Sequence, residues 1–212
     1  MPWIIIATFV SYLIGSIPTA YIFGRVLEGI DIRKFGSGNV GATNAMRVLG
    51  KPVGITVLII DVLKGFLPIV FLGNFLAPRV TSLPLGIIRI ILGIACICGH
   101  NWTVFLGFKG GKGIATTLGV LWGLSLGIPA LKLIIALTIL TWVVVFLLAR
   151  IISVASVITA LALPIYTALL RQGKTLFFLS LILCFFAILR HKSNIQRVLQ
   201  GKEPRLKFGK NP

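Results

Sequence analysis

Charge is scarce in this sequence, and acidic charge is the scarcest. Only 12% of the 212 residues are charged, and four of them are acidic. Hydrophobic residues make up 57% of the chain, and the mean hydropathy is +1.04. This leaves too little polar surface to cover a soluble globule of the same size. The composition therefore excludes a soluble protein and indicates one that resides in a bilayer.

The shortage of acidic residues also limits the chemistry. A Ser-His-Asp triad needs a carboxylate that orients the histidine, and Asp61 is expected inside a membrane span. The three cysteines, Cys96, Cys98 and Cys184, lie in apolar runs without a cluster at metal-ligand spacing. We therefore expect no triad, buried cysteines, and no metal or nucleotide cofactor.

Continuous apolar runs predict an all-α integral membrane protein, because only helices or closed barrels satisfy the backbone in lipid. The first run follows no basic segment and has no clear cleavage site, so we expect it to stay as a span. We expect one membrane-embedded domain over residues 1–212, built as a seven-helix bundle. The predicted spans are 3–23, 53–76, 84–100, 114–130, 132–149, 152–170 and 175–190.

Lysine and arginine are distributed unequally between the two predicted sides. Fifteen fall on one side: Arg25, Arg33, Lys34, Arg47, Lys51, Lys109, Lys112, Arg150, Arg190, Lys192, Arg197, Lys202, Arg205, Lys207 and Lys210. The other side has five: Arg79, Arg89, Lys132, Arg171 and Lys174. The positive-inside rule makes the first side cytoplasmic, with the N-terminus outside and the C-terminus inside. The net charge of +17 favours contact with anionic lipids, whereas the dispersed cations do not favour nucleic acid.

A glycine-rich loop over residues 24–52 is the longest non-apolar stretch. Closely spaced glycines let backbone N–H groups converge on an anion, and a nearby arginine can fork two hydrogen bonds onto a phosphate. A helix beginning near Thr43 would bring Thr43, Asn44 and Arg47 onto neighbouring faces. The alternative is a flexible connector. The candidate residues in this loop are Gly36, Ser37, Gly38, Asn39, Gly41, Thr43, Asn44 and Arg47.

A second polar loop, over residues 101–113, contains Lys109, Gly110, Gly111 and Lys112. It is not a P-loop, since the required first glycine and final hydroxyl are absent and an apolar helix precedes it. Glycines, two lysines and a helix beginning near Ile114 can nevertheless hold an anion. An anchor that simply follows the positive-inside rule is the alternative.

Other polar groups lie close to these loops in the predicted topology. His100 ends the third span and titrates near neutrality, although an interfacial histidine is often structural. Asp61 and Lys64 lie three apart within a span, where an intrahelical ion pair is favoured over a proton relay. Ser153 and Ser156 are expected to bond between helices. The tail over 191–212 continues a helix on which Arg190, Asn194 and Arg197 share a face. The alternative to a functional role for this face is a helix that simply rests at the membrane surface.

Three segments together resemble the bacterial acyl-phosphate:glycerol-3-phosphate acyltransferases along almost the whole chain. They are Gly36–Asn44 with Arg47, Gly99–His100 with Phe108–Gly113, and Arg190–Ile195 with Gly201–Glu203. The family usually has proline where this chain has Thr103, a change expected to soften the turn after His100.

The resemblance implies a phosphate pocket and an active site in the inner membrane that faces the cytoplasm. The implied pocket residues are Ser37, Thr43, Arg47, Lys112 and Asn194, with His100, Ser156, His191 and Glu203 as further active-site or supporting residues. The implied reaction moves an acyl group from acyl phosphate to the 1-hydroxyl of glycerol 3-phosphate. We expect direct transfer, with either His100 or a substrate phosphate as the base. The alternative class is a transporter of a phosphorylated metabolite, although no repeat or midplane polar path supports it. The sequence leaves the oligomeric state undetermined.

Overall fold

The computed structural model describes residues 2–205, and every regular element in that range is helical. The chain forms two compact units, one up to Ile128 and the other from Pro129 onward. The first unit contains α1 (Pro2–Ser16), α2 (Thr19–Glu28), the 3₁₀ turn η1 (Ile32–Lys34), α3 (Ala42–Val48), α4 (Lys51–Leu76), α5 (Leu85–Asn101), the 3₁₀ turn η2 (Val104–Leu106) and α6 (Ile114–Ser125). The second contains α7 (Leu131–Ala149), α8 (Ile152–Leu169), α9 (Gly173–Arg190) and α10 (Lys192–Leu199).

Small residues let the helices of the first unit pack closely. The main pairs are α1 with α5 and α4 with α6, and α4 also packs against α5. A Cβ at Gly15 would collide with the backbone of Cys96, and one at Gly65 would collide with the backbone of Thr116. Backbones that approach this closely are typical of helix association in lipid.

The first predicted span is interrupted. Helix α1 ends at Ser16 and α2 begins at Thr19, with a bend of 42° between them. Pro18 supplies no N–H group to a continuous helix, which accounts for the break within an otherwise apolar run. The span predicted over 3–23 is thus made of two helices, and whether the bent pair crosses the membrane as one span stays a prediction.

The fourth predicted span is also shorter than expected. Helix α6 has only 12 residues and ends at Ser125, whereas the apolar run predicted a span over 114–130. The segment that follows contains a turn, with the Ile128 N–H bonded to the Leu124 carbonyl. Among residues 2–205, five helices are long and apolar enough to cross a membrane, or six spans result if the bent α1–α2 pair forms one. A count of seven stays a prediction.

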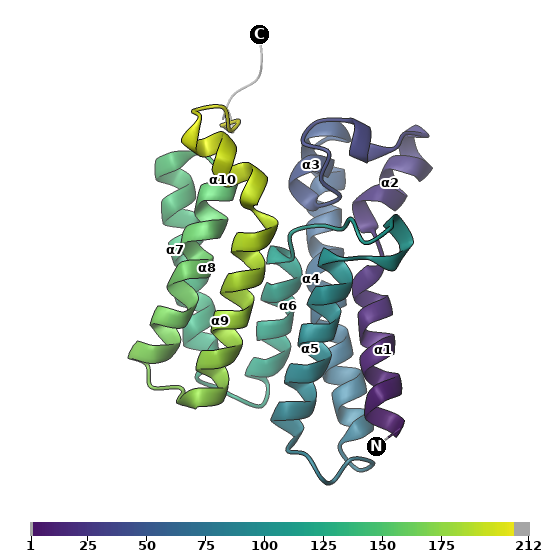
Figure 1. Ribbon diagram of the computed structural model, residues 1–212, viewed down its shortest axis with the longest axis vertical. Coiled ribbons are helices and arrows are strands. Elements are labelled where there is room, and N and C mark those ends of the chain that lie inside the picture. The colour runs from purple at the N-terminus through teal and green to yellow at the C-terminus, as the bar shows by residue number, and fades with distance from the viewer. Residues whose placement is uncertain (1, 206–212) are drawn as a thin grey trace. The chain divides into compact units, whose positions relative to one another are not determined.

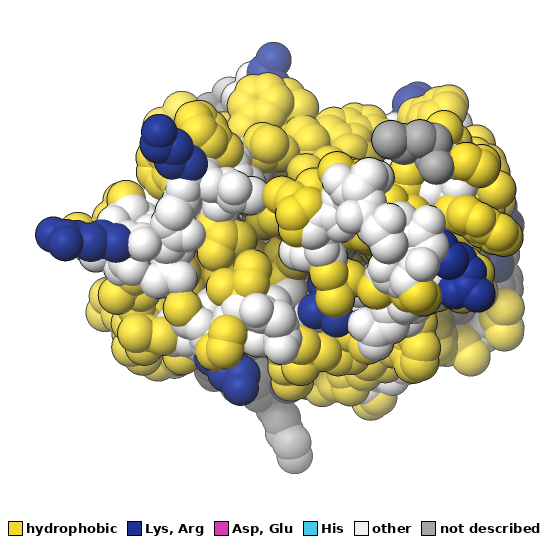
Figure 2. All heavy atoms as spheres, turned by 90° about the horizontal axis from the view of Figure 1, so that it is seen from below, with side chains coloured by type: hydrophobic (Ala, Val, Ile, Leu, Met, Phe, Trp, Pro, Cys, Tyr) yellow, Lys and Arg dark blue, Asp and Glu magenta, His cyan; other side chains and the backbone are white. Residues whose placement is uncertain are grey.

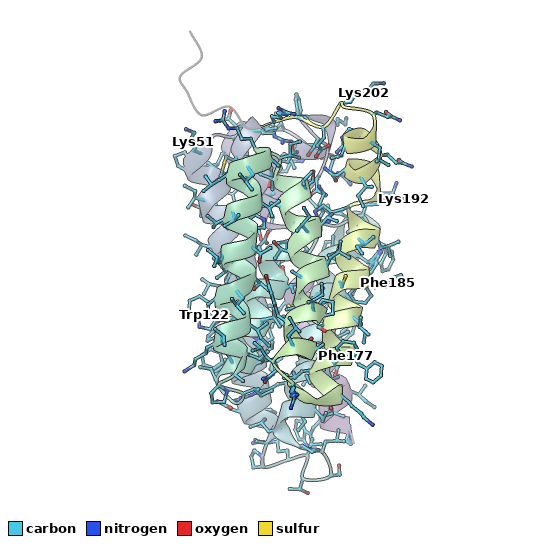
Figure 3. The ribbon with its side chains drawn as sticks, turned by 90° about the vertical axis from the view of Figure 1, so that its left-hand side faces the viewer. Lys51, Trp122, Phe177, Phe185, Lys192 and Lys202 are labelled. Atoms are coloured by element: carbon cyan, nitrogen blue, oxygen red, sulfur yellow. The ribbon has the colours of Figure 1, made fainter. Side chains whose placement is uncertain are left out.

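In the second unit, α8 packs against both α7 and α9, and α10 packs on α8 and α9. Two hydroxyl pairs connect neighbouring helices, with Thr141 Oγ1 2.6 Å from Tyr166 Oη and Thr167 Oγ1 3.0 Å from Ser180 Oγ. Figure 3 shows Lys192 at the upper end of this unit and Phe177 lower down on α9. The described tail ends at Arg205, so Lys207, Lys210 and the rest of the predicted tail lie outside the described residues.

Large apolar side chains remain exposed on the long helices of both units. Phe71 of α4 is 67% exposed and Leu148 of α7 is 81% exposed. Surface of this kind is stable against lipid and is costly in water. At the lower ends of the units, hydrophobic side chains also predominate, with isolated lysines and arginines among them (Figure 2).

Candidate active site

The first glycine-rich loop is folded around the side chain of Asn44. Asn44 Oδ1 accepts a 2.8 Å hydrogen bond from the Ser37 N–H, while Nδ2 donates to the carbonyls of Ile32 (3.3 Å) and Phe35 (3.1 Å). Asn44 is only 1% exposed. Its amide is thus occupied within the loop, although the sequence placed Asn44 among the substrate ligands.

Glycine is required at two positions of this loop. Gly36 and Gly38 have φ values of +60° and +70°, in the left-handed region that other residues rarely adopt. A Cβ at Gly36 would also collide with the amide of Asn44. At the start of the loop, Asp31 caps η1, and hydrogen bonding from Arg33 lowers the pKa of the Asp31 carboxyl to about 2. The loop therefore has a fixed shape.

The fixed loop presents its hydroxyl and guanidinium groups outward. Ser37 and Arg47 are exposed, and Thr43 is half-buried. Helix α3 begins at Ala42, as the spacing predicts, so Thr43 and Arg47 lie one turn apart on it. Within residues 2–205, the Arg47 guanidinium makes no hydrogen bond or ion pair. The remaining candidates in this segment are Asn39 and Gly41. The Asn39 Oδ1 lies so close to Gly41 that a Cβ at Gly41 would crowd it.

The second loop is held against the end of α5. The Gly110 N–H bonds to the Asn101 carbonyl (3.2 Å), and the Gly111 N–H bonds to the His100 carbonyl (2.9 Å). A Cβ at either glycine would collide with α5, at Gly111 with the His100 ring. Lys109 is exposed and Lys112 is half-buried.

Helix α6 begins directly after this loop, with Gly113 as its N-cap in a left-handed conformation. Gly113 has no side chain with which to cap the backbone N–H groups of the first turn. Together with the nearby lysines, the helix N-terminus can attract an anion. The structure therefore has the features from which the sequence predicted an anion cradle.

Thr103 ties the turn after His100 to α1. Its hydroxyl donates a 2.5 Å hydrogen bond to the Ser16 carbonyl and accepts one from the Phe105 N–H. The threonine hydroxyl supplies a connection that proline could not make. The softening of this turn relative to a proline-containing one stays a prediction.

A buried polar cluster lies beside His100. The Lys64 Nζ is 2.7 Å from Asp61 Oδ1 and donates to the Ile17 carbonyl, which the α1–α2 break leaves available. The Thr19 hydroxyl also donates to Asp61 Oδ1, at 3.0 Å. The predicted Asp61–Lys64 ion pair is therefore confirmed. His100 Nδ1 lies 3.9 Å from the same carboxylate oxygen, a neighbour that the sequence analysis did not find.

In Figure 1, the α2–α3 segment and the loop before α6 lie toward the end of the first unit that is opposite the N-terminus. The contact of Gly65 with Thr116 places the start of α6 beside the middle of α4. The Asp61–Lys64 pair lies in this middle part of α4, close to the start of α6 and to the loop that precedes it.

The second unit has its own polar cluster around Glu203. The carboxylate accepts hydrogen bonds from Ser153 Oγ (2.7 Å), Asn194 Nδ2 (2.6 Å) and Arg197 Nε (2.7 Å). Burial raises the pKa of Glu203, but these three donors outweigh it and leave the pKa below its ordinary value. This carboxylate thus fastens the chain after α10 to α8 and α10.

Two further predicted residues are buried in the second unit. The Ser156 hydroxyl accepts from Trp142 Nε1 (3.2 Å) and donates to the Ile152 carbonyl, which confirms the expected bond between helices. His191 Nδ1 lies 2.7 Å from the Ala187 carbonyl. Asn194 Oδ1 is buried without a hydrogen-bond partner among the described residues. The predicted site residues are thus divided between the two units, and each group is built by its own unit.

These features define an all-helical membrane protein whose first unit carries two ordered, cationic, glycine-rich loops. The sequence matches the family "Glycerol-3-phosphate acyltransferase" over residues 5–201. The chain belongs to this family.

Known relatives cover nearly the whole chain. A glycerol-3-phosphate acyltransferase of Fusobacterium nucleatum is 41% identical over 93% of this chain and 95% of its own length. One from Thermoanaerobacter sp. is 43% identical, with 95% of each chain covered. Among solved structures, the glycerol 3-phosphate form of PlsY, an integral membrane glycerol 3-phosphate acyltransferase, is 34% identical with a TM-score of 0.82 and 96% of each chain covered. The lysophosphatidic acid form is 33% identical with a TM-score of 0.79, covering 96% of this chain and 95% of that one.

Proposed function

We propose that this protein transfers an acyl group from acyl phosphate to the 1-hydroxyl of glycerol 3-phosphate. The products are 1-acylglycerol 3-phosphate, a lysophosphatidic acid, and inorganic phosphate, and the reaction serves phospholipid synthesis. One observation carries the proposal: an ordered glycine loop presents Arg47, exposed and without a partner among residues 2–205, within a chain of the acyltransferase family. The acceptor and the product are the ligands of the two similar PlsY structures.

The proposed chemistry is a direct transfer. The glycerol hydroxyl attacks the acyl carbonyl, the bond from that carbon to the phosphate oxygen breaks, and the hydroxyl proton goes to a base. Acyl phosphate is already activated, so the protein's main task is to hold two anions together and align the reacting groups. His100 or a substrate phosphate oxygen acts as the base.

The first unit supplies the phosphate ligands in this proposal. Arg47 and Lys112 offset the phosphate charge, Ser37 and Thr43 donate neutral hydrogen bonds, and Lys109 adds a cation at the loop edge. The glycines give the loops their shape and expose backbone N–H groups. Asn44 holds the first loop in place. No metal or other cofactor takes part.

For the second unit, we propose only that its polar residues are needed for full activity, and we assign them no contact with substrate. We expect substitution of Asn194, His191 or Ser156 to lower turnover, as the family resemblance implies. Glu203 supports Asn194 and Arg197 through the hydrogen bonds described above.

We further propose a bacterial inner-membrane location, with seven spans, the N-terminus outside and the active site facing the cytoplasm. The Lys and Arg distribution supports this orientation. The acyl chain would lie among apolar helices, while glycerol 3-phosphate enters from water.

Purified protein in lipid, given palmitoyl phosphate and glycerol 3-phosphate, tests the activity. We expect phosphate and 1-acylglycerol 3-phosphate in equal amounts, and at least a hundredfold loss in Arg47→Ala and Lys112→Ala, since each removes a charged ligand. Lys132→Ala is the control, because Lys132 is exposed at the start of α7. Absence of turnover from folded wild type would contradict the proposal and direct attention to phosphate-ester flux in proteoliposomes.

A covalent trap tests the direct route. During turnover with radiolabelled acyl phosphate, we expect no acyl group on the protein after denaturation. A label on Ser37 or Ser156 would show an acyl-enzyme and overturn the direct mechanism.

A further inference from the structure

His100 lies between two different neighbours. Its Nδ1 faces the Asp61 carboxylate at 3.9 Å. Its Nε2 lies on the side of the second loop, because a Cβ at Gly111 would collide with that nitrogen. The Gly111 N–H is also bonded to the His100 carbonyl, which fixes the loop against the ring. The imidazole therefore spans the distance from a buried acid to the loop that contains Lys112.

Asp61 is itself held in place by side chains of two helices, α4 and α2. Lys64, one turn away on α4, is 2.7 Å from Oδ1, and Thr19 at the start of α2 donates to the same oxygen. Lys64 also donates to Ile17 between α1 and α2. Asp61 and Lys64 are 2% and 5% exposed. The hydrogen bonds from Thr19 to Asp61 and from Lys64 to Ile17 fix the geometry of this buried pair.

We propose that Asp61 is a positioning residue for acyl transfer, whose carboxylate selects the His100 tautomer with its proton on Nδ1. A carboxylate at this distance attracts the N–H side of a neutral imidazole and repels its lone pair. The Nε2 lone pair is then directed at the Gly110–Lys112 segment, where it accepts a proton or a hydrogen bond. Asp61 acts through His100 and does not touch substrate. The catalytic role of Asp61 rests on the proposed function. The assignment of the His100 tautomer is independent of that function.

Histidine NMR tests the tautomer without any turnover. The chain has two histidines, so ¹⁵N-histidine labelling gives two imidazoles to assign. His191 is an internal reference, since its Nδ1 faces a carbonyl that can only accept and must therefore carry a proton. At a pH where both rings are neutral, we expect Nδ1–H for both in wild type.

Asp61→Asn should move the His100 signals toward the Nε2–H pattern and leave those of His191 unchanged, because an amide can donate to Nδ1. Asp61→Asn/Lys64→Met removes both charges and avoids a buried, unpaired ammonium. An Nε2–H His100 in wild type would overturn the proposal. So would His100 signals that stay unchanged in both variants.

A double-mutant cycle then tests whether Asp61 acts through His100. We expect Asp61→Asn to lower kcat at least tenfold in the wild-type background with little change in KM, and less than twofold in the His100→Ala background. Equal losses in both backgrounds would show a general structural effect and overturn the proposal. Ser11→Ala, which removes a buried hydrogen bond to the Leu92 carbonyl, is the matched control. If wild type shows no turnover at all, the proposed function fails while the NMR result still decides the tautomer.

Discussion

Asn44 supports the shape of the first loop through three hydrogen bonds to loop backbone. We predict that Asn44→Ala lowers kcat/KM at least tenfold, because the loop that presents Ser37 loses its internal support. Asn44→Asp should be nearly as impaired, since a carboxylate can accept from Ser37 but cannot donate to the two carbonyls. Thr56→Val, which removes an exposed hydrogen bond on α4, is the control. Full activity in Asn44→Asp would contradict this role.

At the scale of single residues, the sequence predicted which residue types build the site better than it predicted where their side chains point. Gly36 and Gly38 were expected to shape an anion loop, and both do adopt left-handed backbone. Asn44 was expected to contact substrate, but spacing does not tell whether an amide faces outward or into its own loop. The approach of His100 to Asp61 was missed, because it depends on how α4 and α5 align along their axes.

Glu203 gives a prediction about pH. Its pKa lies below the ordinary value of 4.5, so the ionised form stabilises the fold. This stability is fully present above the unfolded-state pKa and is lost as pH falls through the lower folded-state pKa. We expect melting temperature in detergent to drop as pH falls below about 4.5, and to drop less in Glu203→Gln. Wild type and variant with the same pH dependence would refute this role.

At the scale of helices, α4 and α6 depend on glycine. A Cβ at Gly119 would collide with the Val62 carbonyl. We predict that Gly119→Ala separates the helices and lowers stability by about 1–3 kcal/mol, the usual cost of overpacking. Gly86→Ala is the matched control, because Gly86 is helical with nothing within 4 Å of its Cβ position. Thermal unfolding of both variants in detergent provides the measurement, and equal melting temperatures would contradict the prediction.

Helix existence was predictable and helix continuity was not. Hydropathy predicted a span over 53–76 and the structure has α4 at Lys51–Leu76, since a long apolar run has few other stable forms in lipid. The break near Pro18 was missed because the flanking residues are all compatible with a span. It matters for the site, because the break exposes the Ile17 carbonyl to which Lys64 donates.

For the whole molecule, the distribution of charge carries the last prediction. Fifteen of the 21 lysines and arginines were assigned to one membrane side, which the positive-inside rule makes cytoplasmic. Single cysteines at exposed Lys34 and Lys174 test both sides with a membrane-impermeant maleimide. We expect Lys174→Cys to react in intact bacterial cells and Lys34→Cys to react only after the inner membrane is opened. The parent protein should not react, because Cys96 and Cys184 are buried and Cys98 is partly buried. The reverse pattern would place the glycine loops outside, away from cytoplasmic glycerol 3-phosphate, and would contradict the proposed orientation together with the substrate supply that depends on it.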